Sequence, residues 1–490
     1  MPITDRFYGY IRFARYHSGF FLMRIVTTPL AIAFIASTQA QVLISDSLIN
    51  SMTVAELQAQ GVGDADFDID VYKVRYNTVD PQGQPTIASG AMVVPQGTCY
   101  FPLACYHHGT IVEREAVPSR LSSEIIVGYF LGGSGYVSVL PDYVGLGDSQ
   151  ILHPYMHAAT ESAAALDLMR AAREFCGANG IQLNGQVFLA GYSQGGHASM
   201  ATHKTIQEQF GGEFNVTANA PCSGPYQLSG VQAQAMIDTI PYPAPYYLPY
   251  IVYSYASIYP DLAAILPDVF QPPYDVLLPP LFDGTHSAGD IDAVMPTVPS
   301  QALQSAMLQA FSTDPQHPFR LALQENDNFD WAPQAPVWMF YCEGDGHVFY
   351  ENTIAALQAM NANNAPNVLA SSMGVTNDHG ACALPALMAA KSWFDGLKGD
   401  CTWDGVSEAK ATRWTVYPNP SSSGWTIECA SAMDRTDWQL TNAHGCVITG
   451  GTSSNLFVFK IPTDGLSAGC YLLRLVSERS VQMTTVLVER

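Results

Sequence analysis

The chain has 490 residues, of which 43 are acidic and 21 are basic, so its formal net charge is −22 at pH 7. This length exceeds one ordinary domain, and we expect two folded units with substantial apolar cores. The strong negative charge repels phosphate backbones and argues against a nucleic-acid partner.

The first forty residues have the layout of a secretory signal peptide. From Met23 onward, a basic residue precedes an apolar stretch of about a dozen residues, and small residues follow up to Ala40. That stretch is short for a membrane span, although a retained anchor is the competing interpretation. We expect Sec export with cleavage near Ala40, with Met23 as an alternative start of translation.

Strand and helix patterns alternate through residues 41–405. Two alternating segments predict an antiparallel edge pair, and short apolar runs separated by helical patterns predict buried parallel strands. The edge segments are 67–76 and 86–95, the helical patterns are 122–131 and 157–177, and the buried runs are 102–110, 136–143, 186–192, 214–222, 335–345 and 367–373. This order predicts an α/β fold with a mostly parallel sheet flanked by helices.

The alternation of strand and helix patterns is interrupted over residues 223–335. This segment contains the tyrosine- and proline-rich run "YPAPYYLPYIVYSYASIYPDL". A long insertion in a compact domain is usually functional, and so many tyrosines are not all expected in a core. We expect a cap over a binding cleft, with a purely structural subdomain as the alternative. The apolar, aromatic character favours an acyl or aromatic ester as ligand, although tyrosine also stacks on sugars.

The composition changes after a linker at residues 406–413. Short alternating strands separated by Gly, Ser and Asn fill residues 414–490 and predict a small β-sandwich. Ten cysteines in an exported chain make disulfides plausible, and Cys382 and Cys401, which bracket one expected helix, are a candidate pair.

The stretch "LAGYSQGGHASM" places Ser193 between two glycines, after an apolar run and before a helical pattern. In Gly-x-Ser-x-Gly the serine occupies a strained strand-to-helix turn, and the glycines let strand and helix approach closely. The pattern alone is common, so the nucleophile assignment depends on its partners. A plain polar residue in a tight turn is the alternative.

A nucleophilic serine needs a histidine base that is oriented by a carboxylate, in the chain order Ser, acid, His for this arrangement. Asp345 follows one late strand and His379 follows the next, so we expect these two as acid and base, with Glu343 as the fallback acid. We expect His347 to lie too close to Asp345 in sequence, and Asp378 too close to His379, to play these parts.

The oxyanion of the reaction needs two backbone N–H donors. One is expected from Gln194, directly after the nucleophile, and the other from Thr110, with Gly109 as second choice. We expect neither a metal nor an organic cofactor, because Ser/His/Asp chemistry uses none and no cysteine or histidine spacing suggests zinc.

With these residues in place, the chain resembles the α/β-hydrolase superfamily, in particular exported serine esterases and lipases related to the secretory lipases. The resemblance covers about residues 67–399. It rests on His108-Gly109-Thr110, "LPDYVGLGDS", "HPY", "GYSQGGHA", "YCEGDGHV" and "DHGACALPAL". It implies a triad of Ser193, Asp345 and His379, and a structural role for Pro141-Asp142-Tyr143.

The tail resembles the C-terminal sorting domain of type IX secretion substrates. "VYPNPSSSGWTI", "LTNAHG" and "IPTDGLSAGCYLLRL" carry this resemblance, whereas Cys429, Cys446 and Cys470 are unusual for such tails. It implies type IX secretion machinery as a partner, with passage through the outer membrane and release or attachment at the cell surface.

The sequence therefore predicts a secreted serine hydrolase of carboxylic esters, acting on a small-molecule or lipid ester. A prolyl-oligopeptidase-like peptidase shares fold and triad but usually carries a β-propeller, for which few residues precede the first expected strand. A surface-binding protein on an inactive hydrolase scaffold is the third hypothesis, and the complete set of expected site residues argues against it.

Overall fold

The computed structural model describes residues 41–399, 401, 414–429, 436–442, 447–453, 458–477 and 480–489. The expected signal region, 1–40, and the expected linker, 406–413, lie outside the described residues. No helix in this described part combines the length and apolar character needed to cross a membrane.

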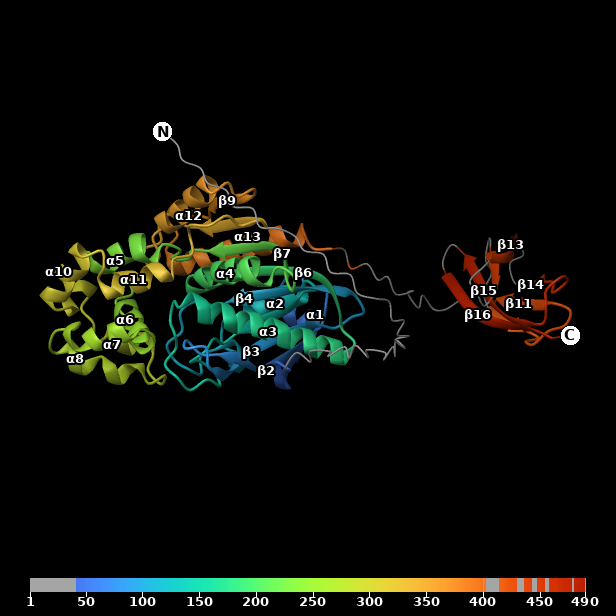
Figure 1. Cartoon of the computed structure of the whole chain (residues 1–490), viewed down its shortest axis with the longest axis horizontal. Coiled ribbons are helices and arrows are strands. Elements are labelled where there is room, and N and C mark those ends of the chain that lie inside the picture. Colours follow the sequence, from blue (N-terminus) through green and yellow to red (C-terminus); the bar gives the residue numbers. More distant parts are fainter. Residues whose placement is uncertain are drawn as a thin grey trace, which may run out of the picture. The chain divides into compact units, whose positions relative to one another are not determined.

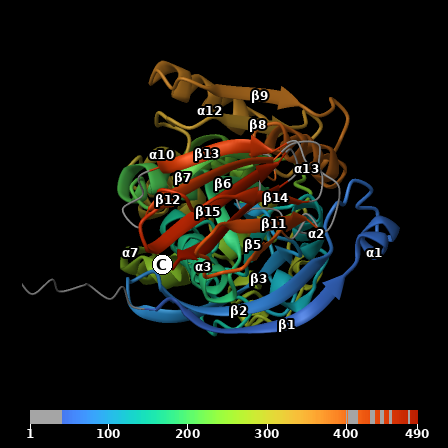
Figure 2. The ribbon, with the colours of Figure 1, turned by 90° about the vertical axis from the view of Figure 1, so that its right-hand side faces the viewer.

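Within the described residues, nine strands form one sheet in the order β1-β2-β3-β5-β4-β6-β7-β8-β9, with β9 and β1 at opposite edges (Figure 2). The strands are β1 (Leu43–Met52), β2 (Ile69–Val79), β3 (Pro85–Pro95), β4 (Tyr100–His107), β5 (Val137–Pro141), β6 (Gln182–Tyr192), β7 (Asn215–Cys222), β8 (Val337–Tyr341) and β9 (Val368–Ser372). The strands from β5 to β9 in this order pair in parallel, whereas β1, β2 and β3 are antiparallel. The predicted mostly parallel sheet is confirmed.

Strand β1 was not expected from the sequence. It pairs with β2 at the sheet edge, and most of its side chains are exposed. An edge strand that buries little apolar surface lacks the hydrophobic alternation by which strands are recognised.

Helices cover both faces of the sheet (Figure 1). One core cluster joins the sheet to α1, α2 and α13, and two others join the opposite face to α3, α4 and α12. These helices are α1 (Val54–Ala59), α2 (Ile125–Gly133), α3 (Ala158–Asn179), α4 (Gln194–Thr205, continued by a π-helical turn Ile206–Phe210), α12 (Glu351–Ala362) and α13 (His379–Asp395). Packing on both faces explains why the central strands read as continuous apolar runs.

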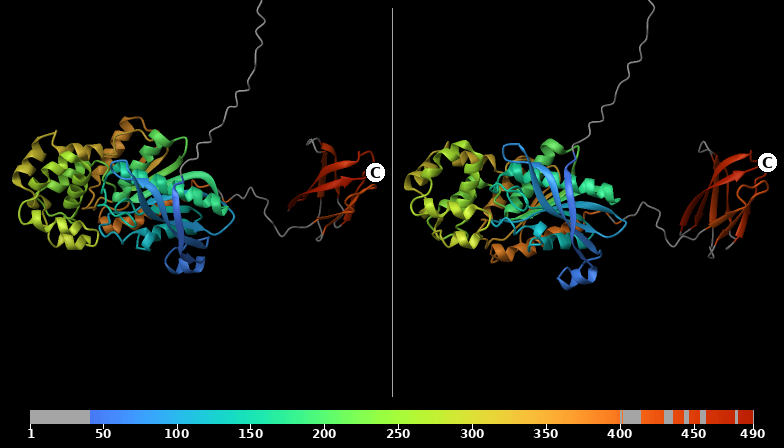
Figure 3. Two further views of the ribbon diagram at one scale, coloured as in Figure 1. Left: turned by 60° about the horizontal axis from the view of Figure 1, so that its bottom comes forward. Right: turned by 90° about the horizontal axis from the view of Figure 1, so that it is seen from below.

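The segment between β7 and β8 is helical and gathers beside the sheet in both views of Figure 3. Its helices are α5 (Ala233–Ile237), α6 (Tyr247–Ile258), α7 (Pro260–Ile265), α8 (Tyr274–Leu277), α9 (Ala288–Asp292), α10 (Ser305–Thr313) and α11 (Pro318–Glu325). As expected, not all of its tyrosines are core residues: Tyr246, Tyr253 and Tyr259 are only partly buried. Tyr242, Tyr247, Tyr250 and Tyr255 are buried in a cluster that this segment forms largely by itself.

Two disulfides occur among the described residues, Cys99–Cys401 and Cys342–Cys382. The expected pairing of Cys382 with Cys401 is therefore wrong. Both cysteines have partners that are distant in sequence but adjacent in space, and spacing along the chain cannot reveal such neighbours.

The C-terminal strands form two antiparallel sheets, β10-β11-β14 and β13-β12-β15-β16. Trp425 and Ile461 of the first sheet share one buried cluster with Leu440 and Leu473 of the second, as in a small β-sandwich. The strands are β10 (Trp414–Tyr417), β11 (Trp425–Cys429), β12 (Thr436–Asn442), β13 (Val447–Ser453), β14 (Val458–Ile461), β15 (Gly469–Ser477) and β16 (Ser480–Val488). The predicted sandwich is confirmed.

Candidate active site

Ser193 lies in the sharp turn between β6 and α4, with φ 60° and ψ −120°. Few non-glycine residues adopt this conformation, and it commonly marks a functional turn. A Cβ on Gly191 would overlap the backbone of Gly195, and a Cβ on Gly195 would overlap the carbonyl of His107. The two glycines are therefore required for β6 and α4 to meet at this angle.

Asp345 and His379 come together from loops that follow β8 and β9. His379 Nδ1 lies 2.7 Å from Asp345 Oδ2, while Asp345 Oδ1 accepts hydrogen bonds from the backbone N–H groups of His347 and Val348. Asp345 is 4% exposed and His379 is 9% exposed. Because Nδ1 is held by the carboxylate, Nε2 is the ring nitrogen left to exchange a proton with a reacting group.

The other acidic candidates stay outside this pair. Glu343 is exposed, and Asp378 caps α13 by accepting a hydrogen bond from the Ala381 N–H. Ser193 is buried at 4% exposure, and no hydrogen bond joins its hydroxyl to His379 in the described part of the chain. The described structure thus brings Asp345 and His379 into direct contact, whereas Ser193 makes no hydrogen bond to His379 in it.

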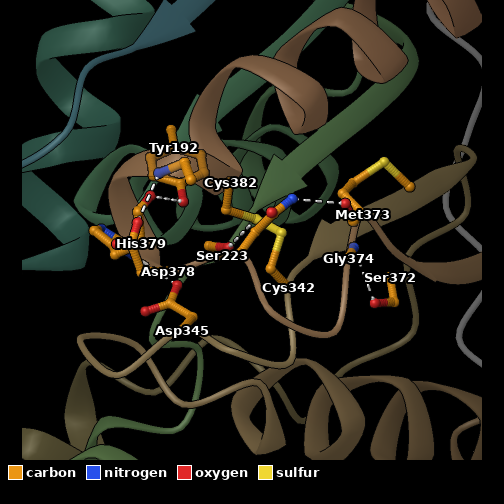
Figure 4. Close-up of a disulfide and its surroundings, with 12 residues drawn as sticks. Tyr192, Ser223, Cys342, Asp345, Ser372, Met373, Gly374, Asp378, His379 and Cys382 are labelled. Atoms are coloured by element: carbon orange, nitrogen blue, oxygen red, sulfur yellow. Dashed lines mark hydrogen bonds and ion pairs between the residues drawn. A yellow bond between two sulfur atoms is a disulfide. The ribbon is translucent and has the colours of Figure 1, made fainter.

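The Cys342–Cys382 disulfide ties the acid loop to the histidine helix (Figure 4). Cys342 lies three residues before Asp345, and Cys382 lies three residues after His379. The Tyr192 hydroxyl also donates to the His379 carbonyl at 2.5 Å. The disulfide therefore joins the Asp345 loop to α13, and the Tyr192 hydrogen bond joins His379 to the residue before Ser193.

The predicted oxyanion donors flank the nucleophile. In the described residues, no hydrogen bond uses the backbone N–H of Thr110 or of Gln194, so both are free to bind a substrate oxygen. The Gln194 side chain points away, toward Glu161 at 2.9 Å and His153 at 2.8 Å. Gly109, the second candidate for the oxyanion donor, lies close to the nucleophile turn: a Cβ on Gly109 would lie 3.8 Å from Ser193 Cβ.

The "PDY" motif, Pro141-Asp142-Tyr143, contacts the loop that carries Gly109 and Thr110. Asp142 is fully buried and accepts hydrogen bonds from the hydroxyls of Ser89 and Ser119, each at 2.6 Å. Tyr143 donates its hydroxyl to the His108 carbonyl at 3.3 Å. The motif therefore has a structural position beside the oxyanion loop.

His347, which the sequence analysis set aside as a base, lies against His379, and this contact was not expected. Its ring stacks on that of His379, with centroids 4.9 Å apart and planes 12° from parallel. Burial, and then the neighbouring His379, lower the pKa of His347, so its neutral form is favoured. Its position two residues after Asp345 was the only available signal, and side-chain direction in a loop cannot be read from spacing.

The helical segment covers the nucleophile. Tyr247 from α6 and Ser193 line the same small cavity. Burial raises the pKa of Tyr247, and the hydroxyls of Tyr246, Thr110 and Ser193 oppose this rise. The cavity left between Ser193 and this segment has a volume of about 10 Å³, close to the space of one water molecule. This space is too small for an ester in the described structure.

This fold and this arrangement of turn, acid loop and histidine loop define the α/β-hydrolase class. The secretory lipase family model matches residues 119–272, which include Ser193 but neither Asp345 nor His379. The model of the secretion system C-terminal sorting domain matches residues 415–489. The resemblance to both families is confirmed.

Solved structures agree with this classification. A putative hydrolase from Legionella pneumophila is 25% identical, with a TM-score of 0.68 over 74% of this chain and 100% of that one. The rice cell wall degrading esterase LipA from Xanthomonas oryzae is 29% identical, with a TM-score of 0.63 over 73% and 97%.

Candida antarctica lipase A, 15% identical with a TM-score of 0.55 over 74% of this chain and 84% of that one, shares the fold. No curated protein matches the chain by sequence. Together, the family matches and the structural neighbours support a hydrolase that acts on esters, and the sorting-domain match supports a secreted or surface location.

Proposed function

We propose that this protein is an exported serine hydrolase that cleaves carboxylic esters through an acyl-enzyme on Ser193. The observation that carries the proposal is the strained Ser193 turn beside the Asp345–His379 hydrogen bond, with two unused N–H donors next to it. Acyl transfer needs a nucleophile, an oriented base and an oxyanion site, and these groups supply all three.

In the proposed reaction, Ser193 Oγ attacks the ester carbonyl carbon while His379 Nε2 takes the hydroxyl proton. Asp345 holds the imidazole orientation and stabilises the imidazolium. The N–H groups of Thr110 and Gln194 bind the oxyanion, and one such donor is worth about 3–4 kcal/mol. His379 then protonates the departing alcohol, and water, activated by the same histidine, releases the acid.

In this proposal, each part of the chain has its own role. Residues 1–40 direct export through the Sec route, residues 41–405 form the catalytic domain, and the 223–335 cap covers the site. After the 406–413 linker, residues 414–490 are the sorting domain through which the type IX secretion machinery handles the chain. Their match to a sorting-domain model supports this assignment.

The experiment that tests the proposal compares Ser193→Ala with Ser199→Ala, a buried serine further along α4. With a nitrophenyl butyrate ester, we expect Ser193→Ala to lose at least about a thousandfold in kcat, as removal of a triad member does. The Ser199→Ala control should stay within a few-fold of the parent. Full activity of Ser193→Ala would refute the assignment.

A further inference from the structure

A cavity lies between α2 and α13, on the face of the sheet opposite α3. Figure 2 shows where these two helices lie relative to the sheet. The volume of the cavity is about 260 Å³, and β4 and β6 form its floor. A small-molecule site occupies roughly 300–1,000 Å³, so this cavity is near the lower end of that range. Its walls include Ile126, Val127 and Phe130 of α2, and Ala383, Leu387 and Met388 of α13.

One end of the cavity lies close to the Ser193 turn. Gly109 lines it, and a Cβ on Gly109 would lie only 3.8 Å from Ser193 Cβ. Tyr192, the residue before the nucleophile, also lines it, and its hydroxyl holds the His379 carbonyl. Gly109 and Tyr192 therefore place this end of the cavity next to the Ser193 turn.

The cavity is long and apolar. Its lining on α13 runs from Ala383 to Phe394, which is about 16 Å at about 1.5 Å per helical residue. The two charged groups in its walls already have partners, because Glu124 accepts from the Tyr106 hydroxyl at 2.9 Å and Lys391 is ion-paired. What remains for a ligand is a mostly apolar lining.

We propose that this cavity between α2 and α13, and not the space under the cap, binds the acyl chain of the ester and selects an unbranched chain of medium length. The inference rests on the proposed function. The ester carbonyl would lie at the Ser193 end of the cavity, and the acyl chain would lie against its apolar walls. Each buried CH₂ group favours binding by about 0.8 kcal/mol, or roughly fourfold.

The test places a bulky side chain in the cavity and an identical one just outside it. Ala383→Phe narrows the cavity, whereas Ala381, two residues earlier on α13, is exposed and does not line it. We expect Ala383→Phe to reduce kcat/KM for nitrophenyl decanoate at least tenfold and to leave nitrophenyl butyrate within about twofold. Ala381→Phe should change neither. Val127→Phe, which narrows the cavity from α2, should repeat the first result.

An unchanged chain-length profile in both filled variants, or equal losses on both esters in folded protein, would overturn the inference. Calorimetry of decanoic acid with Ser193→Ala protein provides a readout that needs no turnover. If the parent protein cleaves no ester, but Ser193→Ala binds decanoic acid and the added Ala383→Phe change abolishes this binding, the proposed function is refuted and the cavity is supported. Ester turnover without such binding would refute the cavity alone.

Discussion

Asp345 uses both of its carboxylate oxygens, one to hold His379 and the other to hold its own loop. Replacing it with asparagine keeps the shape but removes the charge that stabilises the imidazolium. We expect Asp345→Asn to lower kcat for a short-chain ester by about 10³- to 10⁴-fold. Steady-state kinetics on the purified protein measure this loss.

The matched control is Glu343→Gln in the same loop, because Glu343 is exposed and lies outside the Asp345–His379 pair. It should leave kcat within about twofold. An equal loss in both variants would contradict the assignment of Asp345 as the acid.

Residue-level prediction from sequence was good where chain order constrains geometry. The elbow pattern located the strained turn at Ser193, and strand order indicated that Asp345 and His379 would meet, although their catalytic roles stay predictions. The stacking of His347 on His379 was missed, because it depends on how one loop places a ring.

At the scale of elements, the Cys342–Cys382 disulfide fixes the start of α13 against the end of β8. We expect Cys342→Ala/Cys382→Ala to lower both the melting temperature and kcat, because each cysteine lies three residues from the acid–base pair. Loss of a disulfide typically costs about 2–4 kcal/mol of stability. Thermal unfolding and ester kinetics on the same sample measure the two effects.

The control removes the other disulfide with Cys99→Ala/Cys401→Ala. Its sequence separation is 302 rather than 40, so the chain-entropy model predicts at least as large a loss of stability. None of the hydrogen bonds described around Ser193 involves it, so kcat below the melting transition should be unchanged. A loss of kcat confined to this control pair would contradict the account.

Tyr247 of α6 lines the small cavity at Ser193, so it is the candidate residue for limiting access to that serine. We expect Tyr247→Ala to increase the inactivation rate by a bulky fluorophosphonate several-fold more than the rate by a small sulfonyl fluoride, because only the large reagent needs the extra space. Tyr253→Ala is the control, since Tyr253 packs on Phe270 and Phe282. The idea fails if the two variants accelerate the bulky reagent equally.

Element-level prediction succeeded for the buried strands and failed in two places. Strand β1 buries too little apolar surface to be recognised, and the sequence did not indicate which tyrosines of α6 form a core. In both cases the tertiary partner determines burial, and the local pattern does not show that partner.

The whole molecule should lose stability in mild acid. Burial lowers the pKa of several histidines below the value near 6.5 of an unfolded chain, to about 4 for His107, His153 and His157 and about 3 for His203. Their neutral forms stabilise the native state fully above about pH 6.5, and this contribution is lost as the pH falls toward about 4. His197 opposes them, because burial lowers its pKa but the Glu161 carboxylate produces a net rise.

Urea unfolding at pH 7 and pH 5 measures the balance, and we expect a lower free energy of unfolding at pH 5. His203→Gln should reduce the difference between the two values, because the variant loses one group that must bind a proton on unfolding. A free energy that rises on acidification would contradict the dominance of the buried neutral histidines.

The central claim is that Ser193 is the nucleophile, and the most direct measurement is active-site labelling of the protein lacking residues 1–40. A fluorophosphonate should attach one group per molecule, peptide mapping should locate it on Ser193, and ester hydrolysis should disappear in proportion to labelling. Folded protein that takes no label, or that carries the label on another residue while activity is lost, would contradict the account.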